Sequence, residues 1–512
     1  MRKQIILLAL CASACTALAC KPRKPIVILH DNDVHCAIER YPQVKCLYDR
    51  MTAADTAYIG LASSGDLIQG AVAGTLSEGR QVIDVLRVMP YDAITLGNHE
   101  FDYGTERMFE LMARFGNERV SCVNFSDKEG HFPFGSYVMK RYGRTKVAFV
   151  GVLTPNTMID EKRAFITPAG DTLYTLQNDD RVVEIVQTQV NKARKAGAKY
   201  VIVLSHMGEK DVPLTSVDLI SRTYGIDAVL DGHTHTLLPQ QLVKNKKGQL
   251  VPLTQTGQKL DNIGKLYISP DGKVEASVLS LGEVGKDPRV QAVVDSIAVV
   301  NAPTINQRVG YSEVKLTNMS ADGKTRLVRN TETNTGNLAA DAIRWYAKSD
   351  IAFANGGGLR KDIPEGEVTL GEVIDMQPFN NDINVYEVPG RVLVEMIRYA
   401  SAVLRTQKES GMLIQPSGFH YVYSKSQDRV LEVTVLNPAT GVYEPLQPDK
   451  IYSLAVAQYN FSQYGTIVAG CRMKQGNLGL DNMITKTFIE QALGGRIGQE
   501  YAAPQGRFKI VE

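Results

Sequence analysis

The chain has 512 residues, of which 44% are hydrophobic and 22% are charged, and its formal net charge is +2. A single hydrophobic core rarely extends over so many residues, so we expect two domains of a globular protein. The near balance of charge argues against a protein dedicated to nucleic-acid polymers, which usually carries a large basic excess.

The N-terminus predicts a targeting segment. A short basic region, MRKQ, precedes the apolar run IILLALCASACTALA, which is too short to be a convincing membrane-spanning helix. Ala17-Leu18-Ala19 before Cys20 fits a signal-peptidase site and also resembles a lipoprotein box, in which Cys20 would carry a lipid. We therefore predict a signal peptide over residues 1–19 and export to the periplasm or cell envelope, with a lipid on Cys20 as the one route to a membrane.

Residues 26–283 alternate apolar β-like runs with helical stretches, a pattern that predicts an α/β fold. The turn-like segments 244–249 and 269–273 predict two hairpins. Helices are expected over residues 78–89, 102–116 and 178–197.

Residues 287–310 predict a helical linker, and a second α/β alternation starts near residue 312. We expect a helix over residues 335–348 and strands over 351–354, 383–388, 418–424 and 452–459.

Four cysteines, Cys36, Cys46, Cys122 and Cys471, lie beyond the targeting segment, too few for a disulfide framework. Although Cys36 follows a histidine directly, we expect a small buried residue or a Cys36–Cys46 pair rather than a metal ligand.

Five apolar runs of the first half end in side chains that bind metals. Because strand ends of an α/β sheet meet at one edge, these side chains should lie together. Carboxylate, amide and imidazole groups without thiolate favour two hard or borderline divalent cations over a structural zinc. The runs and their endings are VILHDNDVH (Asp33, His35), YIGLASSGD (Asp66), AITLGNHE (Asn98, His99), VIVLSH (His206) and AVLDGHTH (His233, His235).

Local spacing supports this interpretation. Asp33 and His35 are two residues apart, so an extended backbone would point both to one face, and His233 and His235 repeat the spacing. Asp66 lies in GDLIQG, where glycines allow close approach from both sides, as a ligand shared by two cations needs.

Asp102 follows His99 by three residues and could orient its imidazole. An oriented imidazole beside two metals can stabilise charge on a phosphoryl group or give a proton to the leaving oxygen.

The order and spacing of NDVH, GDLIQG, GNHEFDYG, SHMG and GHTH resemble the signature of calcineurin-like metallophosphoesterases. More narrowly they resemble the secreted 5′-nucleotidase family, which includes UDP-sugar hydrolases and 2′,3′-cyclic-nucleotide 2′-phosphodiesterases. RNTETNTGNLAADAI, NGGGLRKDI, QPFNN and QPSGFHYVY resemble the C-terminal substrate domain of that family. The resemblance implies a four-layer α/β/β/α sandwich over residues 20–286, a helical linker over 287–311 and an α/β substrate-binding domain over 312–512.

The resemblance also implies a role for each matching residue. One metal would be held by Asp33, His35 and His235 and a second by Asn98, His206 and His233, with Asp66 bridging them. His99 and Asp102 would form the catalytic dyad, and a metal-bound hydroxide would attack phosphorus. The metals, of unknown identity, would be Zn, Mn, Co or Fe.

In the second half, Arg329, Asn355 and Arg360 match phosphate-contacting positions, and Phe379 matches one side of a clamp that stacks the nucleobase. The other side falls in YNFSQYGTIVAG, which departs from the family pattern and lacks its aspartate. Phe461 is our prediction there, with Tyr459 and Tyr464 as rivals. We expect hydrolysis of nucleoside 5′-monophosphates; the alternatives are a cyclic-nucleotide phosphodiesterase/3′-nucleotidase, a UDP-sugar hydrolase, a sulfur-oxyacid hydrolase and a catalytically dead surface nucleotide-binding protein.

Overall fold

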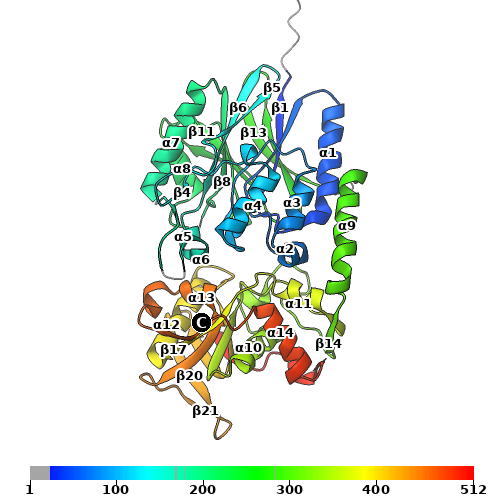
Figure 1. Ribbon diagram of the computed structural model, residues 1–512. Coiled ribbons are helices and arrows are strands. Elements are labelled where there is room, and N and C mark those ends of the chain that lie inside the picture. The colour runs from blue at the N-terminus through cyan, green and yellow to red at the C-terminus, as the bar shows by residue number, and fades with distance from the viewer. Residues whose placement is uncertain (1–23, 168–169, 178, 211, 283) are drawn as a thin grey trace, which may run out of the picture.

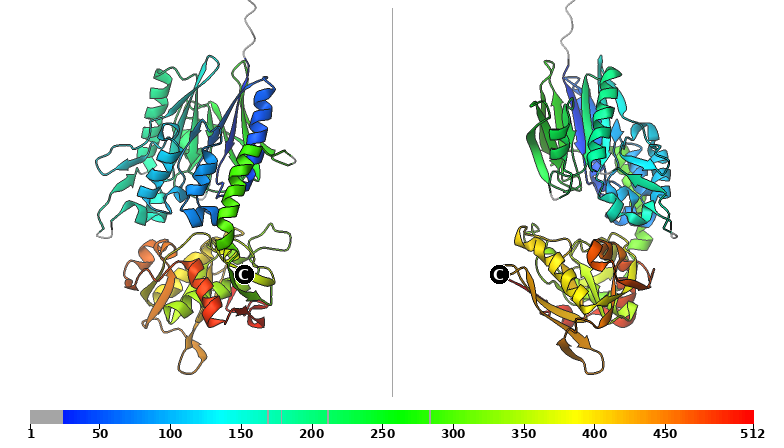
Figure 2. Two further views of the ribbon diagram at one scale, coloured as in Figure 1. Left: turned by 45° about the vertical axis from the view of Figure 1, so that its right-hand side comes forward. Right: turned by 90° about the vertical axis from the view of Figure 1, so that its left-hand side faces the viewer.

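The computed structural model describes residues 24–512 except 168–169, 178, 211 and 283, so the predicted signal peptide lies outside the described residues. Two lobes are stacked along the long axis of the molecule and are joined at one side by α9 (Pro288–Ile305), the helix predicted there (Figure 1). Both views of Figure 2 show the same two-lobed shape. Within the described part of the chain, no helix is long and apolar enough to cross a membrane.

The first lobe contains two sheets that pack face to face through apolar side chains such as Ile28, Phe149 and Ile202. The first sheet has the order β13-β12-β1-β2-β3 and the second the order β10-β11-β9-β8-β6-β5. Their strands are β1 (Ile26–Asp31), β2 (Tyr58–Ser63), β3 (Ala93–Ile94), β5 (Val138–Tyr142), β6 (Thr145–Leu153), β8 (Tyr200–His206), β9 (Ala228–Leu230), β10 (Leu237–Lys244), β11 (Leu250–Thr256), β12 (Asn262–Ile268) and β13 (Val274–Ser280).

Helices cover the outer faces of both sheets. One apolar cluster places α1 (Tyr41–Ala53), α3 (Arg80–Leu86), α4 (Thr105–Phe115) and α9 over the first sheet. A second cluster places α7 (Asp179–Lys195) and α8 (Ser216–Arg222) over the second sheet. The result is the α/β/β/α sandwich that the family resemblance implies. The other α-helices and strands described in this lobe are α2 (Val72–Ser77), α5 (Thr157–Asp160), α6 (Lys162–Phe165), β4 (Phe125–Asp127) and β7 (Tyr174–Leu176), and Asn98–Phe101 form a short 3₁₀ helix.

The second lobe is built on a five-stranded sheet of order β18-β15-β22-β17-β23, accompanied by sheets of order β21-β20-β19-β25 and β16-β14-β24. Helices α10 (Asn334–Ala347), α11 (Leu370–Met376) and α14 (Asp481–Thr487) pack in one apolar cluster, and α12 (Gly390–Ala402) packs in another. The strands are β14 (Arg308–Ser312), β15 (Ile351–Asn355), β16 (Gly366–Thr369), β17 (Ile383–Pro389), β18 (Ile414–Ser417), β19 (Phe419–Ser424), β20 (Arg429–Asn437), β21 (Val442–Pro445), β22 (Ile451–Ala457), β23 (Arg472–Gln475), β24 (Arg496–Ile497) and β25 (Phe508–Val511).

Most predicted elements are present, but two differ in an instructive way. The helix predicted over residues 78–89 is present but shorter: Glu78 and Gly79 adopt φ of 47° and 81°, and α3 spans Arg80–Leu86. A left-handed pair cannot continue a right-handed helix, so α3 begins two residues later than predicted. The strand predicted over residues 452–459 ends at Ala457, where α13 (Gln458–Ser462) begins.

Candidate metal centre and active site

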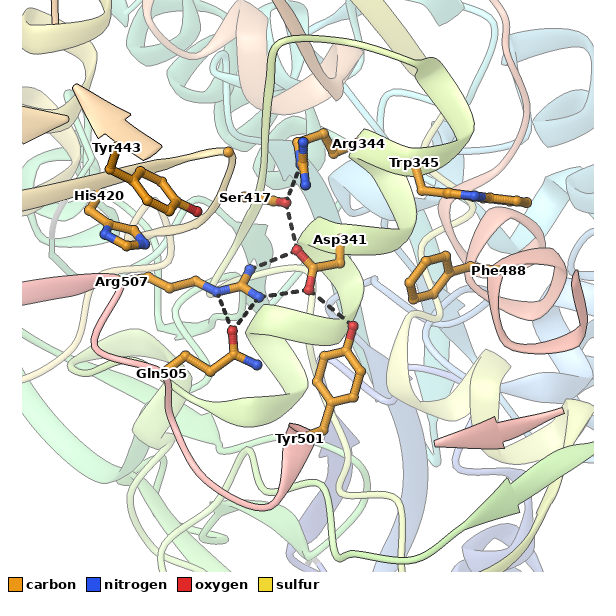
Figure 3. Close-up of a pocket in the computed structure, with 11 residues that line it drawn as sticks. Asp341, Arg344, Trp345, Ser417, His420, Tyr443, Phe488, Tyr501, Gln505 and Arg507 are labelled. Carbon is orange, nitrogen blue, oxygen red and sulfur yellow. Dashed lines mark hydrogen bonds and ion pairs between the residues drawn. The ribbon is translucent and has the colours of Figure 1, made fainter. Parts of the chain in front are cut away.

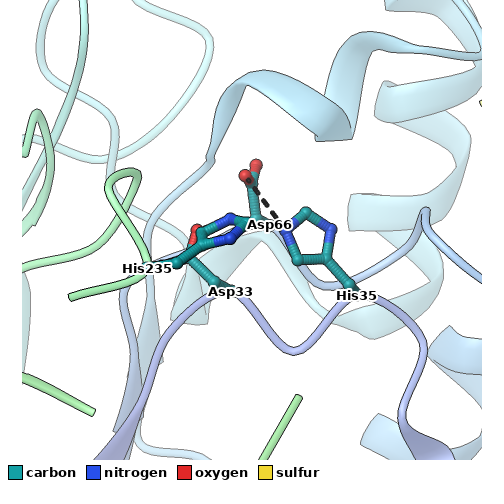
Figure 4. Close-up of side chains that lie close together, drawn as sticks. All are labelled: Asp33, His35, Asp66 and His235. Atoms are coloured by element: carbon teal, nitrogen blue, oxygen red, sulfur yellow. Dashed lines mark hydrogen bonds and ion pairs between the residues drawn. The ribbon is translucent and has the colours of Figure 1, made fainter. Parts of the chain in front are cut away.

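The candidate ligands converge where the strands of the first lobe end. β1 and β2 run parallel, as do β8 and β9, so their carboxyl ends lie on one edge of the sandwich. One donor atom from each of Asp33, His35, Asp66 and His235 lies within 4.8 Å of the others (Figure 4). Three of the four residues are buried, and His235 is about one-fifth exposed.

The reason for this convergence differs from the one predicted. β1 ends at Asp31, and Asp33 and His35 do not alternate on an extended strand; their φ angles are 51° and 46°. His233 and His235 also adopt positive φ, at 78° and 56°, and so does Asp66, at 57°. Residues other than glycine rarely adopt this left-handed backbone conformation unless their surroundings hold them in it. Such residues cluster at functional sites. Left-handed turns, and not strand alternation, therefore aim these side chains.

Backbone hydrogen bonds fix these turns. Asp33 N donates to the Gly65 carbonyl and His35 N to the Asp66 carbonyl, both at 3.0 Å, so the loops after β1 and β2 hold each other. Gly97 allows the loop after β3 to come equally close, because a Cβ atom there would lie 2.1 Å from Asp66 Oδ1.

A second group of candidate ligands adjoins the first. His206 is the last residue of β8, and its Nε2 lies 3.1 Å from Asp66 Oδ2 and 3.9 Å from Asp33 Oδ1. His233 Nδ1 lies 3.1 Å from Asn98 Oδ1, and the His206 and His233 ring centroids are 5.3 Å apart. All seven predicted metal positions therefore meet in one site.

The protonation pattern of the histidines fits bound cations. His206 Nδ1 donates to the Ser64 carbonyl at 2.6 Å, and His35 Nδ1 donates to the Gln69 carbonyl at 3.1 Å. A carbonyl only accepts, so Nδ1 of each ring carries the hydrogen and Nε2 faces the centre, where it can ligate a cation, the arrangement typical of ligating histidines.

The charge around His206 leads to the same conclusion. His206 Nε2 is fully buried without a hydrogen bond of good geometry, yet it faces two carboxylates. Burial by itself would lower the pKa of His206, but Asp66 and Asp33 outweigh burial and raise this pKa to about 10. The site therefore attracts a positive charge, which a divalent metal ion would supply.

His99 and Asp102 form the predicted contact beside this centre. His99 Nδ1 lies 3.0 Å from both carboxylate oxygens of Asp102, and His99 N donates to Asp66 Oδ1 at 2.9 Å. Burial, the largest influence, opposes protonation, but Asp102 and Asp66 together hold the pKa of His99 well above its usual value. Glu161 joins the pair, with one donor atom of each of the three residues within 4.8 Å of the others. No motif pointed to Glu161, which lies 59 positions from Asp102 along the chain by their residue numbers.

Glu100 is a second residue that the sequence reasoning missed. It is buried, and its carboxylate accepts backbone N–H groups from Gly97 at 2.6 Å, Asp66 at 2.9 Å and Leu67 at 2.7 Å. It thereby ties the loop that carries Asp66 to the loop that carries Asn98 and His99. Glu100 is the last residue of the GNHE motif, but nothing in the sequence indicates which groups it contacts.

The second lobe contributes side chains to the same site. Phe379, in the loop between α11 and β17, has its ring centroid 5.6 Å from that of His99, and the Arg360 guanidinium lies 5.3 Å from the Phe379 ring. Arg329 ends the short 3₁₀ turn Leu327–Arg329, and burial together with Arg360 holds the pKa of Arg329 well below its usual value. Asn355, the last residue of β15, donates to the Gly411 carbonyl at 3.0 Å.

Arg329 and Arg360 are two half-buried cations that influence one another electrostatically, and Glu409 is the acidic group that acts on both. Neither makes an ion pair with a described residue within 4.0 Å, whereas nearby Arg326 binds Glu409 at 2.7 Å. Arg329 Nε is buried without a hydrogen bond. Two partly desolvated guanidinium groups of this kind favour an anion such as phosphate.

Phe461 is packed within the second lobe. Phe461 is buried and stacks on Tyr386 with 3.6 Å between ring centroids and 7° between ring planes. Tyr464 is buried in the same apolar cluster. Tyr459, in contrast, is 37% exposed and is close enough to Arg329 to influence it electrostatically. Of these three rings, Tyr459 is therefore the one available to a ligand.

A separate cavity of about 470 Å³ lies on the second lobe and contains none of the predicted site residues (Figure 3). Its floor is an ion pair in which Arg507 donates to both carboxylate oxygens of Asp341, at 2.8 and 2.6 Å. Ser417 and Tyr501 also donate to Asp341, at 2.6 and 3.0 Å, so the carboxylate is already satisfied within the protein. This network anchors the segment that leads into β25, the C-terminal strand.

The sequence matches two family models, "Calcineurin-like phosphoesterase" over residues 26–237 and "5′-nucleotidase, C-terminal domain" over residues 296–469. It is 26% identical to a trifunctional nucleotide phosphoesterase of Bacillus subtilis over 85% of this chain, but it spans only 31% of that longer protein. It is also 26% identical to the venom 5′-nucleotidase of Crotalus adamanteus, over 94% of this chain and 88% of the relative.

Solved structures share the fold over nearly the whole chain. A 5′-nucleotidase precursor from Thermus thermophilus aligns with a TM-score of 0.76 and 23% identity, covering 95% of this chain and 99% of the other. A sulfate thiohydrolase from Thermus thermophilus aligns with a TM-score of 0.69 and 18% identity, covering 96% and 97%. At these identities the likeness establishes the fold and leaves the reaction open.

The two matches together cover both lobes, and the first falls on the domain that carries the candidate metal centre. The chain therefore belongs to the family in which a calcineurin-like phosphoesterase domain is followed by a 5′-nucleotidase C-terminal domain, and it is a metal-dependent phosphoester hydrolase.

Proposed function

We propose that this protein is an exported enzyme that hydrolyses nucleoside 5′-monophosphates to nucleoside and phosphate. Two divalent ions would be held in the first lobe, and the second lobe would bind the rest of the substrate. The proposed domain boundaries are residues 20–286 and 312–512, with residues 287–311 as the linker. The proposed ligands are Asp33, His35 and His235 for one ion and Asn98, His206 and His233 for the other, with Asp66 between them.

The observation that carries this proposal is the approach of the two lobes at His99. The Phe379 ring lies 5.6 Å from the His99 ring, and Arg360 lies over Phe379. A phosphoester bound at the metal centre would therefore extend directly toward an aromatic ring and a guanidinium. These are the groups that stack a nucleobase and bind phosphate oxygens.

Different residues of this chain would have different roles in the reaction. When bound, the two ions would activate water and neutralise charge on the phosphoryl group. Asp102 accepts a hydrogen bond from His99 Nδ1, which leaves Nε2 as the nitrogen that can pass a proton to the leaving oxygen. Glu100 would hold the segments that carry Asp66 and His99 in a fixed position relative to each other.

Recognition of the nucleotide would fall to the second lobe. Arg329 and Arg360, neither of which makes an ion pair with a described residue, would bind phosphate oxygens, and Asn355 would lie beside them. Phe379 would stack on one face of the base. For the other face we favour Tyr459 over Phe461, because Phe461 is buried against Tyr386 and Tyr459 is accessible.

The relatives support a nucleotide substrate. The Crotalus protein is named a 5′-nucleotidase, and the Bacillus protein is named a trifunctional nucleotide phosphoesterase. The second name keeps the cyclic-nucleotide and related phosphoester alternatives open for this chain.

A substrate panel tests the proposal. Purified protein, first stripped of metal and then supplied with Mn²⁺, Zn²⁺, Co²⁺ or Mg²⁺, is assayed with AMP, 3′-AMP, 2′,3′-cyclic AMP and UDP-glucose. We expect the highest kcat/KM for AMP. Faster turnover of 2′,3′-cyclic AMP would favour the phosphodiesterase alternative, and faster turnover of UDP-glucose would favour the nucleotide-sugar alternative. A protein that neither binds metal nor releases phosphate would support the binding-protein alternative.

Export and the lipid on Cys20 need a separate test, because residues 1–23 lie outside the described part of the chain. Cell fractionation of the full chain would show whether it leaves the cytoplasm. A Cys20→Ala variant that still sediments with membranes would contradict the lipid anchor.

A further inference from the structure

The loop that carries Phe379 is held by both lobes. On its own lobe, Asn482 Nδ2 donates to the Gln377 carbonyl at 2.9 Å and to Asn380 Oδ1 at 2.8 Å. Between these two anchors, the carbonyl of Pro378 reaches the first lobe. It accepts hydrogen bonds from Gln69 Nε2 at 2.8 Å and from Thr75 Oγ1 at 3.2 Å.

Gln69 contacts both the candidate metal centre and the loop that carries Phe379. It is the glutamine of GDLIQG, it is fully buried, and its side chain points across the lobe boundary. Its own carbonyl accepts the hydrogen bond from His35 Nδ1 at 3.1 Å. Gly70, at φ 121°, leaves no room for a Cβ atom, which would lie 2.7 Å from His35 Cβ. The backbone of Gln69 therefore lies against the candidate metal centre, while its amide holds the loop of Phe379.

Thr75 is the second donor to this carbonyl and comes from α2. Val72 and Leu76 of the same helix pack against the apolar cluster of the second lobe, so α2 is one of the parts of the first lobe that dock on the second. A proline carbonyl is an acceptor with two lone pairs, and here the two donors occupy both. Phe379 follows this fixed carbonyl directly, so the contact sets where its ring lies over His99.

We propose that Gln69, assisted by Thr75, is a positioning residue that makes the enzyme selective for substrates that carry a base. Its amide holds Pro378, and thereby Phe379, in the position where the ring can stack on the base of a substrate whose phosphate lies at His99. This inference rests on the proposed function, in which Phe379 binds the base.

Matched variants and matched substrates test it. Gln69→Met removes the amide but keeps the length of the side chain, Thr75→Val removes the hydroxyl but keeps the shape, and Thr75→Ser restores the hydroxyl. Gln81→Met is the control, because it breaks the reciprocal 2.8 Å hydrogen bonds between Gln81 and Asn301 on α9, neither of which bonds to the loop of Phe379. AMP is compared with ribose 5-phosphate, which is AMP without the base.

One lost hydrogen bond corresponds to about a two- to tenfold change in binding. We therefore expect the AMP-to-ribose-5-phosphate ratio of kcat/KM to fall about two- to tenfold in Gln69→Met, through the KM for AMP. The fall should be smaller in Thr75→Val, larger in the double variant and absent in Thr75→Ser and Gln81→Met. Equal losses on both substrates, or the same loss in Gln81→Met, would overturn the proposal.

A second measurement does not depend on nucleotide turnover. Hydrogen–deuterium exchange of the whole protein follows the amides of residues 377–382, and we expect faster exchange in Gln69→Met than in Gln81→Met. Unchanged exchange would refute the contact itself. A wild-type protein that cleaves AMP and ribose 5-phosphate equally well would contradict base recognition, and with it the selectivity that we assign to Gln69, while the exchange experiment still decides whether Gln69 holds the loop.

Discussion

Glu100 offers a direct test of how the metal centre is built. In Glu100→Gln the side chain keeps its shape but loses its charge and one of its acceptors. One carboxylate oxygen accepts from Asp66 N and Gly97 N and the other from Leu67 N at 2.7 Å. The amide oxygen of the glutamine can still accept the hydrogen bonds from Asp66 N and Gly97 N. Its NH₂ group then faces the N–H of Leu67, so two hydrogen-bond donors face each other in a buried site.

The size of the expected destabilisation follows from the hydrogen bond that Leu67 N loses. A hydrogen bond to a charged group contributes about 1.5–3 kcal/mol, and an unpaired buried N–H costs about 1–3 kcal/mol. Both figures describe the same lost contact, so we expect the loops that carry Asp66 and Asn98 to be destabilised by about 1–3 kcal/mol. Loss of such a supporting contact typically weakens metal binding about 10–100-fold.

The assay is metal titration by calorimetry, with metal content measured by elemental analysis. Glu118→Gln is the control, since the Glu118 side chain is 78% exposed and lies in a different turn. We expect Glu100→Gln to need higher metal concentrations for full activity and to recover kcat once saturated. Wild-type metal affinity in Glu100→Gln would refute the assignment, and lost kcat at saturating metal would mean that Glu100 acts in the chemistry itself.

Three further outcomes are expected. His99→Asn should abolish most phosphate release from AMP while elemental analysis finds near wild-type metal; loss of metal would make His99 a ligand instead. Arg360→Ala should raise the KM for AMP about tenfold or more, because a charge-assisted contact to phosphate contributes about 1.5–3 kcal/mol, and an unchanged KM would remove the second lobe from substrate binding. Dialysis against a chelator should remove activity, and a single divalent ion should restore it; activity that survives complete metal removal, verified by elemental analysis, would contradict a metal-dependent reaction.

The sequence predicted the architecture well because periodicity and strand endings are local signals. The α/β alternation, the helix α9 and the two hairpins of the first lobe appear where the patterns placed them, whereas the α/β/β/α layering was implied by the family resemblance. The helix expected over residues 78–89 is present as α3, but it begins only at Arg80, because Glu78 and Gly79 adopt positive φ. Sequence periodicity does not contain that information, because the packing of Gly79 against Leu111 and Ile68 makes room for no side chain.

For the candidate site, too, some features follow from the sequence and others only from the fold. The sequence alone determined which donors meet, since Asp33, His35, Asp66, Asn98, His206, His233 and His235 follow strands whose ends must share one edge. Only the tertiary structure decided how they meet, through left-handed turns and not extended strands. It also decided that Phe461 packs on Tyr386 and that Gln69 bonds to Pro378, 309 positions along the chain. The physical reason is that donor type and strand period are properties of neighbouring residues, whereas packing and hydrogen bonding join residues that only the folded chain brings together.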